Sequence, residues 1–526
     1  MDKIVYKRNE VRDKILSGLD FLAKPVVSTL SPRGTNVVVE TERGDHFLTN
    51  DGAVIARNIS SKDSIENAVI EIVKEASLRT NAEAGDGTTT TVLLSSVLIR
   101  ESLRMLEDGV SWIDIRRVLD NFADKLVTKL DKTKISAKGG RGLIDIATTS
   151  ANNDKEIGKY VMEAMNVAKE EGLVFIKPNS KPNVTEVVKD LGFMIKGGIL
   201  FQELMDNTTG KVVLKDTVVL LTDKTLYYPE EAQAILKVAI KSGSKSIVIV
   251  AKDFMGEALN TLIANHVKGL ISIMLVKYPN ENVLYDLATY IGSNVFTDKT
   301  GSIVAKLSEN DLTGANQVFS DKMKTLFTPK VAVTKGLLQL IKRVKDELEK
   351  DKNNDELKSR LSSLTTGVVT INVGGNTPIE INEKIYRYED AINATRGAMK
   401  DGYLPGGGIA ILKAFDEKDC PTQFVSMFKH YTEAVLRQIA ENCGKHTDSV
   451  VEQVKKLSKG NGYNAMNDKY ENLITAGIVD PFMAVKLAIM NSIAVTNIII
   501  SINYYITNDK DKAEDFSTGG TGTRNR

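Results

Sequence analysis

The sequence predicts a multidomain α/β protein, mainly helical toward both ends of the chain and α/β in the middle. The chain has 526 residues, more than one hydrophobic core usually holds, so about three domains are expected. Between residues 218 and 276, short apolar runs alternate with helical patterns, as in βαβ units. On either side of this middle part, apolar residues recur at the spacing of amphipathic helices.

Composition and charge narrow the class of protein. Hydrophobic residues make up 42% of the chain and charged residues 26%, which is typical of a soluble globular protein. The 69 basic and 68 acidic residues leave a net charge of +1, which argues against general binding to nucleic acid or to a membrane surface. Cys420 and Cys443 form no redox or metal motif, and the 4 scattered histidines give a zinc site little support.

Targeting signals are not visible, which predicts a cytosolic protein. Residues 1–7 contain no apolar signal-peptide core. The most apolar late segment, residues 493–506, is interrupted by threonine, asparagine and serine and is too short to span a bilayer. The sparse cysteines fit a reducing compartment.

The N-terminal part is predicted to consist of helices separated by tight turns and one hairpin. A helix over residues 10–30 is expected to break at Pro25, because proline cannot donate a hydrogen bond within a helix. Strands 37–41 and 46–49 flank a Gly-containing turn and predict the hairpin. The other predicted elements are turns at 29–34 and 50–52 and helices from 62 to about 80 and from 92 to about 106.

A glycine- and threonine-rich stretch over residues 84–91 runs directly into the second of these helices. A glycine turn at a helix N-terminus leaves backbone N–H groups free, and the helix dipole adds positive potential, so phosphate would bind well there. Asp86 offers a hard oxygen ligand for Mg²⁺ beside such phosphates. The alternative interpretation is an ordinary capped helix.

Asp51 would lie near the same phosphates if the predicted turns converge. Two carboxylates at such a place suit metal binding or activation of water. Taken alone, Asp51 is better explained as a turn-forming residue. The sequence has neither a G-x-x-x-x-G-K-[ST] motif nor a strand-borne G-x-G-x-x-G motif, which disfavours a P-loop or dinucleotide-binding fold.

The middle and C-terminal parts are predicted from apolar runs, helical spacing and glycine- or proline-rich turns. Residues 193–205 form an apolar, glycine-interrupted loop, and the charges of residues 337–364 are interpreted as the solvated faces of two helices. The predicted strands are 174–176, 218–221, 246–251, 271–276 and 368–375. The predicted helices are 157–168, 230–241, 256–267 and 383–399, with a mainly helical part after residues 406–408. Turns are predicted at 462–466 and 478–481, and a flexible tail at 517–523.

With these stretches laid out, the chain resembles a GroEL-like (group I) chaperonin nearly from end to end. Each matching motif is weak alone, but their order and spacing make the resemblance specific. The matching stretches are residues 29–38, 50–52, 84–90, 150–152, 256–259, 389–391, 394–396, 406–408, 436–439, 462–465 and 480–481.

The resemblance implies a subunit of three domains built from discontinuous segments. A mainly helical equatorial domain that binds ATP would comprise residues 1–132 and 401–526. A small intermediate hinge domain would comprise residues 133–189 and 369–400. An α/β apical domain would comprise residues 190–368.

Roles at the nucleotide site follow where the residues match the family. Asp86 would ligate Mg²⁺, Asp51 would support hydrolysis beside a K⁺ site, and Asp390 would orient or deprotonate the attacking water. A base on a separate domain would couple hydrolysis to closure. The implied nucleotide contacts are Thr29, Leu30, Ser31, Pro32, Asn50, Asp86, Gly87, Thr88, Thr89, Thr90, Gly407, Asn464, Ala465, Met466 and Asp480.

The resemblance also implies partners. The apical domain would hold unfolded or partly folded client proteins on exposed apolar residues, an arrangement that accepts many sequences. The alternative is that several of these residues belong to the apical core. Subunits would form a homo-oligomeric ring of seven, with a possible co-chaperonin lid, and no nucleic acid or membrane partner. The client-binding residues implied are Ile199, Phe201, Leu204, Ile235, Leu236, Leu259 and Ile263.

Several residues depart from the family pattern. Asn50 stands in place of a lysine, Ser31 in place of a glycine, and Met466 in place of a small residue beside the base. Gln202 and Glu203 replace a proline and an aromatic residue, and the tail lacks Gly-Gly-Met repeats. These changes indicate a divergent member, in the bacterial cytosol or in a virus-infected bacterial host.

Two other functions stay open. One is a holdase or scaffold that keeps the chaperonin fold with a weak or uncoupled ATPase, which Asn50 and the altered apical loop motivate. The other is a small-molecule kinase, which is disfavoured because the sequence shows no acceptor site.

Overall fold

The chain divides into two compact units. The terminal unit comprises Met1–Glu163 and Val373–Arg526, and the central unit comprises Ala164–Asn372. The division into three domains stays a prediction. The structure, a computed structural model, describes residues 3–40, 44, 46–137, 140, 142–168, 174–179, 181–190, 192–201, 204, 212–297, 307–321, 324–330, 334–351, 354–365 and 368–508. Residues 202, 203 and 205 and the predicted tail lie outside the described residues.

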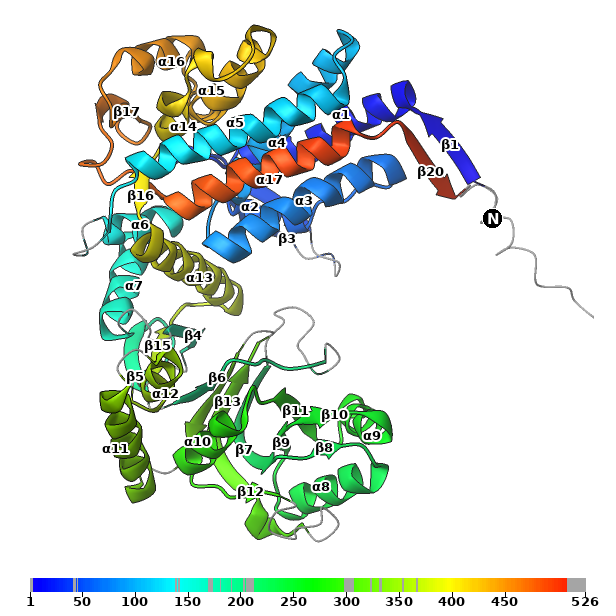
Figure 1. Ribbon diagram of the computed structural model, residues 1–526, viewed down its shortest axis with the longest axis vertical. Coiled ribbons are helices and arrows are strands. Elements are labelled where there is room, and N and C mark those ends of the chain that lie inside the picture. The colour runs from blue at the N-terminus through cyan, green and yellow to red at the C-terminus, as the bar shows by residue number, and fades with distance from the viewer. Residues whose placement is uncertain are drawn as a thin grey trace, which may run out of the picture. The chain divides into compact units, whose positions relative to one another are not determined.

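Long helices form most of the terminal unit (Figure 1). They bury two apolar clusters, and α4 and α17 contribute side chains to both, so these two helices join the halves of the core. The helices are α1 (Arg8–Val27), α2 (Gly52–Arg57), α3 (Ser64–Ala84), α4 (Thr88–Glu107), α5 (Trp112–Thr133), α6 (Leu143–Ser150), α13 (Pro378–Asp401), α14 (Ile409–Ala414), α15 (Val425–Asn442), α16 (Thr447–Lys456) and α17 (Phe482–Ile500), with α7 (Lys155–Ala168) at the boundary between the units. Two short 3₁₀ turns, η5 (Glu417–Asp419) and η6 (Thr422–Phe424), precede α15.

Two predictions about these helices need correction. Helix α1 does not break at Pro25 but continues to Val27. Since this proline lies in the last turn, the missing N–H removes a bond only where the helix is about to end. The prediction that the apolar segment 493–506 is too short to span a bilayer also needs correction, because residues 493–500 belong to α17, which begins at Phe482 and is long and apolar enough to cross a membrane by length and composition alone. It packs against α3, α4 and α5, as expected for a core helix.

Short antiparallel strand pairs complete the terminal unit. The hairpin of β2 (Val37–Glu40) and β3 (His46–Thr49) is confirmed. The predicted turns at 462–466 and 478–481 are wrong in part, because they contain strands. These are β17 (Asn461–Asn464), paired with β18 (Lys469–Asn472), and β19 (Val479–Pro481), paired with β16 (Tyr403–Pro405).

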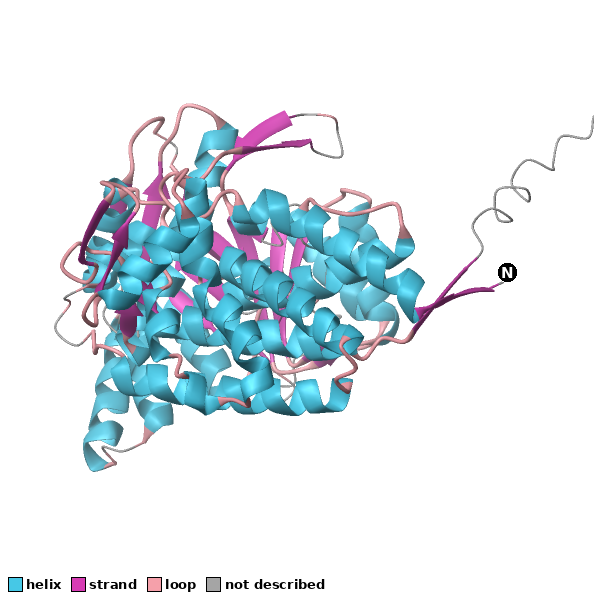
Figure 2. Ribbon diagram, turned by 90° about the horizontal axis from the view of Figure 1, so that it is seen from above, coloured by secondary structure: helices cyan, strands magenta, loops and turns pink. Residues whose placement is uncertain are grey.

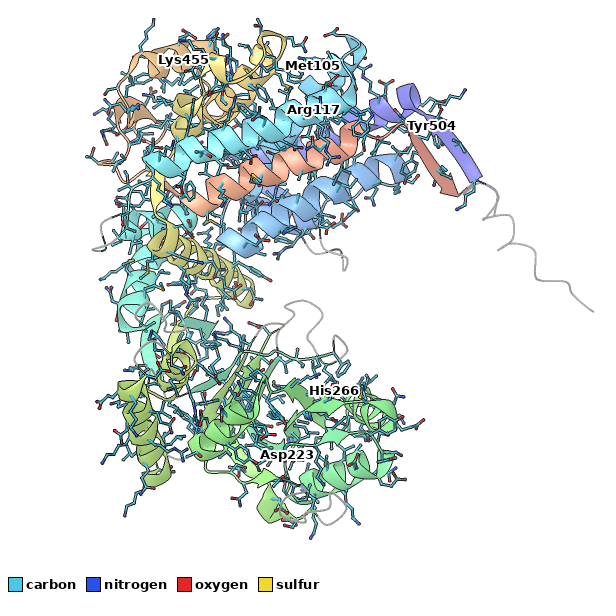
Figure 3. All side chains as sticks on the ribbon, in the orientation of Figure 1. Met105, Arg117, Asp223, His266, Lys455 and Tyr504 are labelled. Atoms are coloured by element: carbon cyan, nitrogen blue, oxygen red, sulfur yellow. The ribbon has the colours of Figure 1, made fainter. Side chains whose placement is uncertain are left out.

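A ribbon of two strands joins the beginning and the end of the terminal unit. Strand β1 (Lys3–Lys7) pairs antiparallel with β20 (Tyr504–Asn508). Figures 1 and 2 both show the ribbon extending away from the helices, and Figure 3 labels Tyr504 on it. Its apolar side chains Val5, Tyr504 and Ile506 are exposed.

The central unit is built on a seven-stranded mixed sheet with the order β11-β9-β7-β13-β14-β6, and β12 pairs with β7. The βαβ prediction is confirmed, since β7, β9 and β11 are parallel neighbours with helices between them. The strands of this sheet are β6 (Phe193–Ile195), β7 (Val212–Thr222), β9 (Ser246–Ala251), β11 (Ser272–Lys277), β12 (Val295–Phe296), β13 (Thr313–Ser320) and β14 (Thr325–Pro329). The helices are α8 (Pro229–Lys241), α9 (Gly256–Val267), α10 (Glu281–Ile291), α11 (Lys335–Lys350) and α12 (Asp355–Thr365), with the 3₁₀ turn η4 (Glu309–Asp311).

Two smaller sheets belong to the same part of the chain. One pairs β8 (Thr225–Leu226) with β10 (Asp253–Phe254) in parallel. The other has the order β4-β15-β5, formed by β4 (Val174–Pro178), β5 (Glu186–Asp190) and β15 (Val368–Val373).

Candidate nucleotide site

The loop between α3 and α4 is the centre of the candidate site. Gly85 ends α3 and Gly87 precedes α4, both with left-handed backbone angles. A Cβ atom on Gly85 would lie 2.3 Å from the side chain of Asn393 on α13, so this close packing admits only glycine. The Thr88 hydroxyl is buried without a hydrogen-bond partner. An unpaired buried polar group beside a helix N-terminus fits a bound phosphate.

A second helix N-terminus meets the first. The Asp51 carboxylate caps α2 by accepting hydrogen bonds from the backbone N–H groups of Ala53 (2.7 Å) and Val54 (3.2 Å). A Cβ on Gly52 would lie 2.1 Å from the Thr89 hydroxyl of α4, so the two helix starts approach closely. The predicted convergence of the turns at 50–52 and 84–91 is therefore present.

Four carboxylates gather near these helix starts. Burial raises the pKa of Asp86, and the Asp51 carboxylate raises it further. Burial, followed by Asp51 and Asp86, raises the pKa of Asp390 well above its usual value, although Asn81 donates a 3.2 Å hydrogen bond to it. Burial and the Asp86 carboxylate raise the pKa of Asp480 to about 7. Such clustering favours the protonated forms of Asp86, Asp390 and Asp480 until a cation binds.

The residues fit a magnesium nucleotide better than a bare metal. Within the described parts of the chain, no group of three or more histidine, cysteine, aspartate or glutamate side chains is placed to hold a metal ion. Mg²⁺ commonly takes one or two carboxylates and completes its shell with phosphate oxygens and water. Asp86 beside two helix N-termini supplies that arrangement. No observation bears on the K⁺ site, which stays a prediction.

The loop at residues 29–34 has a backbone strained at Ser31. Ser31 has φ = 84°, in the left-handed region that favours glycine. The Asn442 amide anchors the loop by donating a 2.8 Å hydrogen bond to the Leu30 carbonyl. The Arg33 guanidinium donates to the Met466 carbonyl (3.3 Å), so this loop contacts the β17–β18 hairpin. Thr29 is buried and Pro32 is exposed.

The strain at Ser31 predicts a stabilising substitution. Ser31→Gly should raise the free energy of unfolding by up to about 1 kcal/mol, because a left-handed non-glycine residue costs roughly 1–2 kcal/mol and glycine loses somewhat more chain entropy. Ser28→Gly, at the end of α1 just before this loop and at φ = −62°, is the control and should destabilise. Thermal unfolding of both variants checks the prediction, and equal effects would contradict it.

Residues expected beside the base lie on short strands and a glycine turn. The buried Asn464 side chain accepts a hydrogen bond from Met466 N (2.9 Å) and donates to Glu471 (2.6 Å), so it shapes the hairpin turn. Ala465 is buried, whereas Met466 is 56% exposed.

The glycine turn at 406–408 approaches Asp480. A Cβ on Gly406 would lie 2.9 Å from an Asp480 carboxylate oxygen, so the turn packs directly on this side chain. Gly407 is left-handed (φ = 65°). The structure therefore brings Gly407 and Asp480 onto neighbouring segments.

The predicted client-binding residues are mostly not exposed. Ile199, Leu204, Ile235 and Leu236 are buried in the core of the central sheet, so the prediction that they form an exposed rim is wrong for these four. The apolar stripe of α8 faces the sheet, which helical spacing alone does not reveal. Phe201, Leu259 and Ile263 are partly buried against the same core.

Other apolar side chains of the central unit are exposed. Tyr227, Tyr228 and Met255 are 52%, 63% and 51% exposed, at the starts of α8 and α9. The two tyrosine rings contact edge to face with centroids 5.3 Å apart. These residues were not predicted as client contacts, although two adjacent tyrosines precede the proline that begins α8.

Three further polar residues, to which no role was predicted, contact the site. Asn81 contacts Asp390, Ser150 donates to Asp86, and Asn152 donates to Asn50. Ser150 and Asn152 lie in a stretch that matches the family pattern, which was the available signal.

The fold and site define a class of protein. The chain belongs to the TCP-1/cpn60 chaperonin family, whose family model matches residues 22–510. This confirms the predicted resemblance to a divergent GroEL-like chaperonin and the multidomain α/β fold.

Among solved structures, the chain is similar to the chaperonin gp146 from the bacteriophage EL 2 (Pseudomonas aeruginosa), crystallised in the presence of ATP-BeFx. The match to crystal form II has a TM-score of 0.66 and 19% sequence identity. Crystal form I matches with a TM-score of 0.61 at 19% identity. Each match covers 96% of this chain and 99% of the other, so the likeness extends over the whole fold.

Proposed function

We propose that this chaperonin binds Mg²⁺–ATP at the carboxylate site and couples ATP hydrolysis to the capture and folding of non-native polypeptides. The observation that carries the proposal is the meeting of two helix N-termini with Asp51, Asp86 and Asp390. When bound, Mg²⁺–ATP supplies the phosphoryl group that passes to water, a reaction that needs positioning and charge neutralisation more than covalent chemistry.

Different groups of the protein bind the phosphates, hold Mg²⁺ and activate the attacking water. The main chain of residues 87–90 and the Thr88 hydroxyl hold phosphate oxygens, and Asp86 holds Mg²⁺. Asp390 orients the attacking water and accepts its proton, while Asn81 fixes one carboxylate oxygen by the 3.2 Å hydrogen bond.

The test is phosphate release from ATP by the purified protein, together with refolding of a chemically denatured enzyme with and without ATP. We expect Mg²⁺-dependent hydrolysis and an ATP-dependent gain of refolded enzyme. Failure to bind nucleotide would overturn the proposal.

A holdase with weak ATPase is the second candidate, and one observation favours it. Asn50 replaces the lysine expected beside the phosphates, and its side-chain oxygen accepts a 3.2 Å hydrogen bond from Asn152. A holdase would bind denatured client equally well with and without ATP, whereas the folding machine would release it.

Self-association fits the surface of the terminal unit. A cavity of about 860 Å³ between α1, β2 and α2 is lined by both polar and apolar side chains, and the apolar ones include Phe21 and Val38, which are 53% and 61% exposed. Exposed apolar patches of this kind mark interaction sites. We propose that the subunits assemble into a homo-oligomeric ring, with seven subunits expected from the family resemblance. Electron microscopy of the purified protein with and without ATP would give the number of subunits in the particle and test whether a lid protein is needed.

We expect clients to bind at the exposed aromatic pair Tyr227 and Tyr228 and the neighbouring Met255. Replacing Tyr227, Tyr228 and Met255 together by serine should weaken binding of a denatured client at least about tenfold, since aromatic anchors contribute about 2 kcal/mol or more. Ile113→Ser removes an equally exposed apolar side chain (50%) from the terminal unit and should leave binding unchanged. Unchanged binding in the triple variant would place the client surface elsewhere.

A further inference from the structure

The turn between α6 and α7 has an unusual backbone. Asn152 and Asn153 are consecutive left-handed residues, with φ of 57° and 64°. The Asp154 carboxylate caps α7 by accepting from Glu156 N (2.9 Å) and Ile157 N (3.1 Å). Asparagine tolerates this region better than most residues, so the sequence specifies a tight, defined reversal.

This turn contacts the nucleotide site twice. The Ser150 hydroxyl donates a hydrogen bond to the second oxygen of Asp86 (3.3 Å), while the first oxygen accepts from Gly87 N (2.6 Å). The Asn152 amide donates to the side-chain oxygen of Asn50 (3.2 Å). Both acidic turns of the site, at residues 50–52 and 84–91, are therefore joined to one short segment.

Helix α6, which ends in Ser150, is itself packed against the rest of the site. Leu143 and Ile146 share an apolar cluster with Ala394 and Ala398 of α13 and with Val479 of β19. Helix α13 carries Asp390 and β19 carries Asp480. The position of Ser150 is thus fixed by the elements that carry two other carboxylates of the site.

We propose that Ser150 and Asn152 are positioning residues that set the magnesium affinity of the nucleotide site. The Ser150 hydroxyl fixes the rotation of the Asp86 carboxylate by its hydrogen bond to one carboxylate oxygen, and the bond between Asn152 and Asn50 holds the turn in place. Groups that orient a metal ligand in this way typically change metal affinity by about 10- to 100-fold. This inference rests on the proposed nucleotide site.

The test measures ADP binding to the full chain by calorimetry over a range of Mg²⁺ concentrations and in excess EDTA. Ser150→Ala should raise the Mg²⁺ concentration for half-maximal enhancement of ADP binding about tenfold and leave binding in EDTA unchanged. Ser150→Thr keeps the hydroxyl and should restore the Mg²⁺ response. Thr148→Ala removes a hydroxyl on the same helix that donates to the Ile144 carbonyl (2.7 Å), and it should behave as the native protein.

Three results would overturn the role of Ser150: an unchanged Mg²⁺ response in Ser150→Ala, equal losses with and without Mg²⁺, or no rescue by threonine. These results differ from failure of the proposed function, in which the native protein itself would bind no nucleotide.

A double-substitution cycle tests the second contact. Asn50→Ala and Asn152→Ala should each weaken the Mg²⁺ response a few-fold, about threefold for one neutral hydrogen bond. Because they remove the same bond, the double variant should equal either single variant. Fully additive effects would contradict the proposed link. Hydrogen exchange without nucleotide gives an independent measurement, since amides of residues 151–154 should exchange faster in Asn152→Ala and in Asn50→Ala.

Discussion

Asp390→Asn is expected to slow ATP hydrolysis by about 10²–10⁴-fold, the usual loss when a general base is removed. The substitution keeps the size of the side chain and its hydrogen-bond partner Asn81 but removes the group that accepts a proton. Nucleotide affinity should hold or rise slightly, because the variant also removes one negative charge from the cluster with Asp51 and Asp86.

Single-turnover phosphate release and equilibrium binding of ADP separate the two effects. Asp401→Asn, at the C-terminal end of helix α13, is the matched control and should retain native turnover. Native turnover in Asp390→Asn would remove this residue from the mechanism. Parallel losses of binding and turnover would instead indicate that the carboxylate supports the fold of the site.

Strands β7, β9 and β11 of the central sheet could be predicted because they contain continuous apolar runs, whereas β12, β13 and β14 were missed and β6 lies within residues predicted as a loop. All six residues of β9 and the four central residues of β11 are buried, a pattern typical of strands in a parallel sheet that is covered on both faces. The strands at 461–464 and 479–481 were missed because they are short, polar and glycine- or proline-containing. They are strands because they pair with β18 and β16, and the residues next to them in sequence do not indicate this pairing.

In the candidate site, too, residues with a distinctive local sequence could be predicted, whereas contacts between residues far apart in the chain could not. Asp86 and the glycines around it are marked by their own neighbours in sequence. The role of Asp390 came from family resemblance, since an aspartate in a helix has no distinguishing local pattern. The contact between Asn50 and Asn152 joins residues 102 positions apart, which no local rule predicts.

The error over the client-binding residues has a physical cause. The family resemblance implied that Ile235 and Leu236 bind clients, and both lie on the apolar face of α8. Helical spacing does not say whether that face meets a sheet or solvent, and here it meets the sheet. Exposure of Tyr227 and Tyr228 is equally a property of the folded unit.

The second large effect is expected at a buried ion pair in the central unit. Asp286 on α10 is 2% exposed, and Arg360 on α12 donates to both of its carboxylate oxygens, with a distance of 2.7 Å from Nη2 to Oδ1. The hydrogen bonds to Asp286 raise the pKa of the Arg360 guanidinium, so this side chain stays charged. Arg360→Met should lower the free energy of unfolding by about 3–5 kcal/mol, because it leaves a buried carboxylate unpaired.

The double variant Asp286→Leu/Arg360→Met distinguishes the value of the pair from the penalty of breaking it. Replacing both partners by apolar groups removes the unpaired charge, so stability should return to within about 1–2 kcal/mol of the native protein or exceed it. Arg343→Met, an exposed arginine on α11, is the control and should change stability by less than about 0.5 kcal/mol. Urea unfolding of the full chain and hydrogen exchange in α12 give the measurements. Equal stability of Arg360→Met and Arg343→Met would show that the ion pair does not hold α12 against α10.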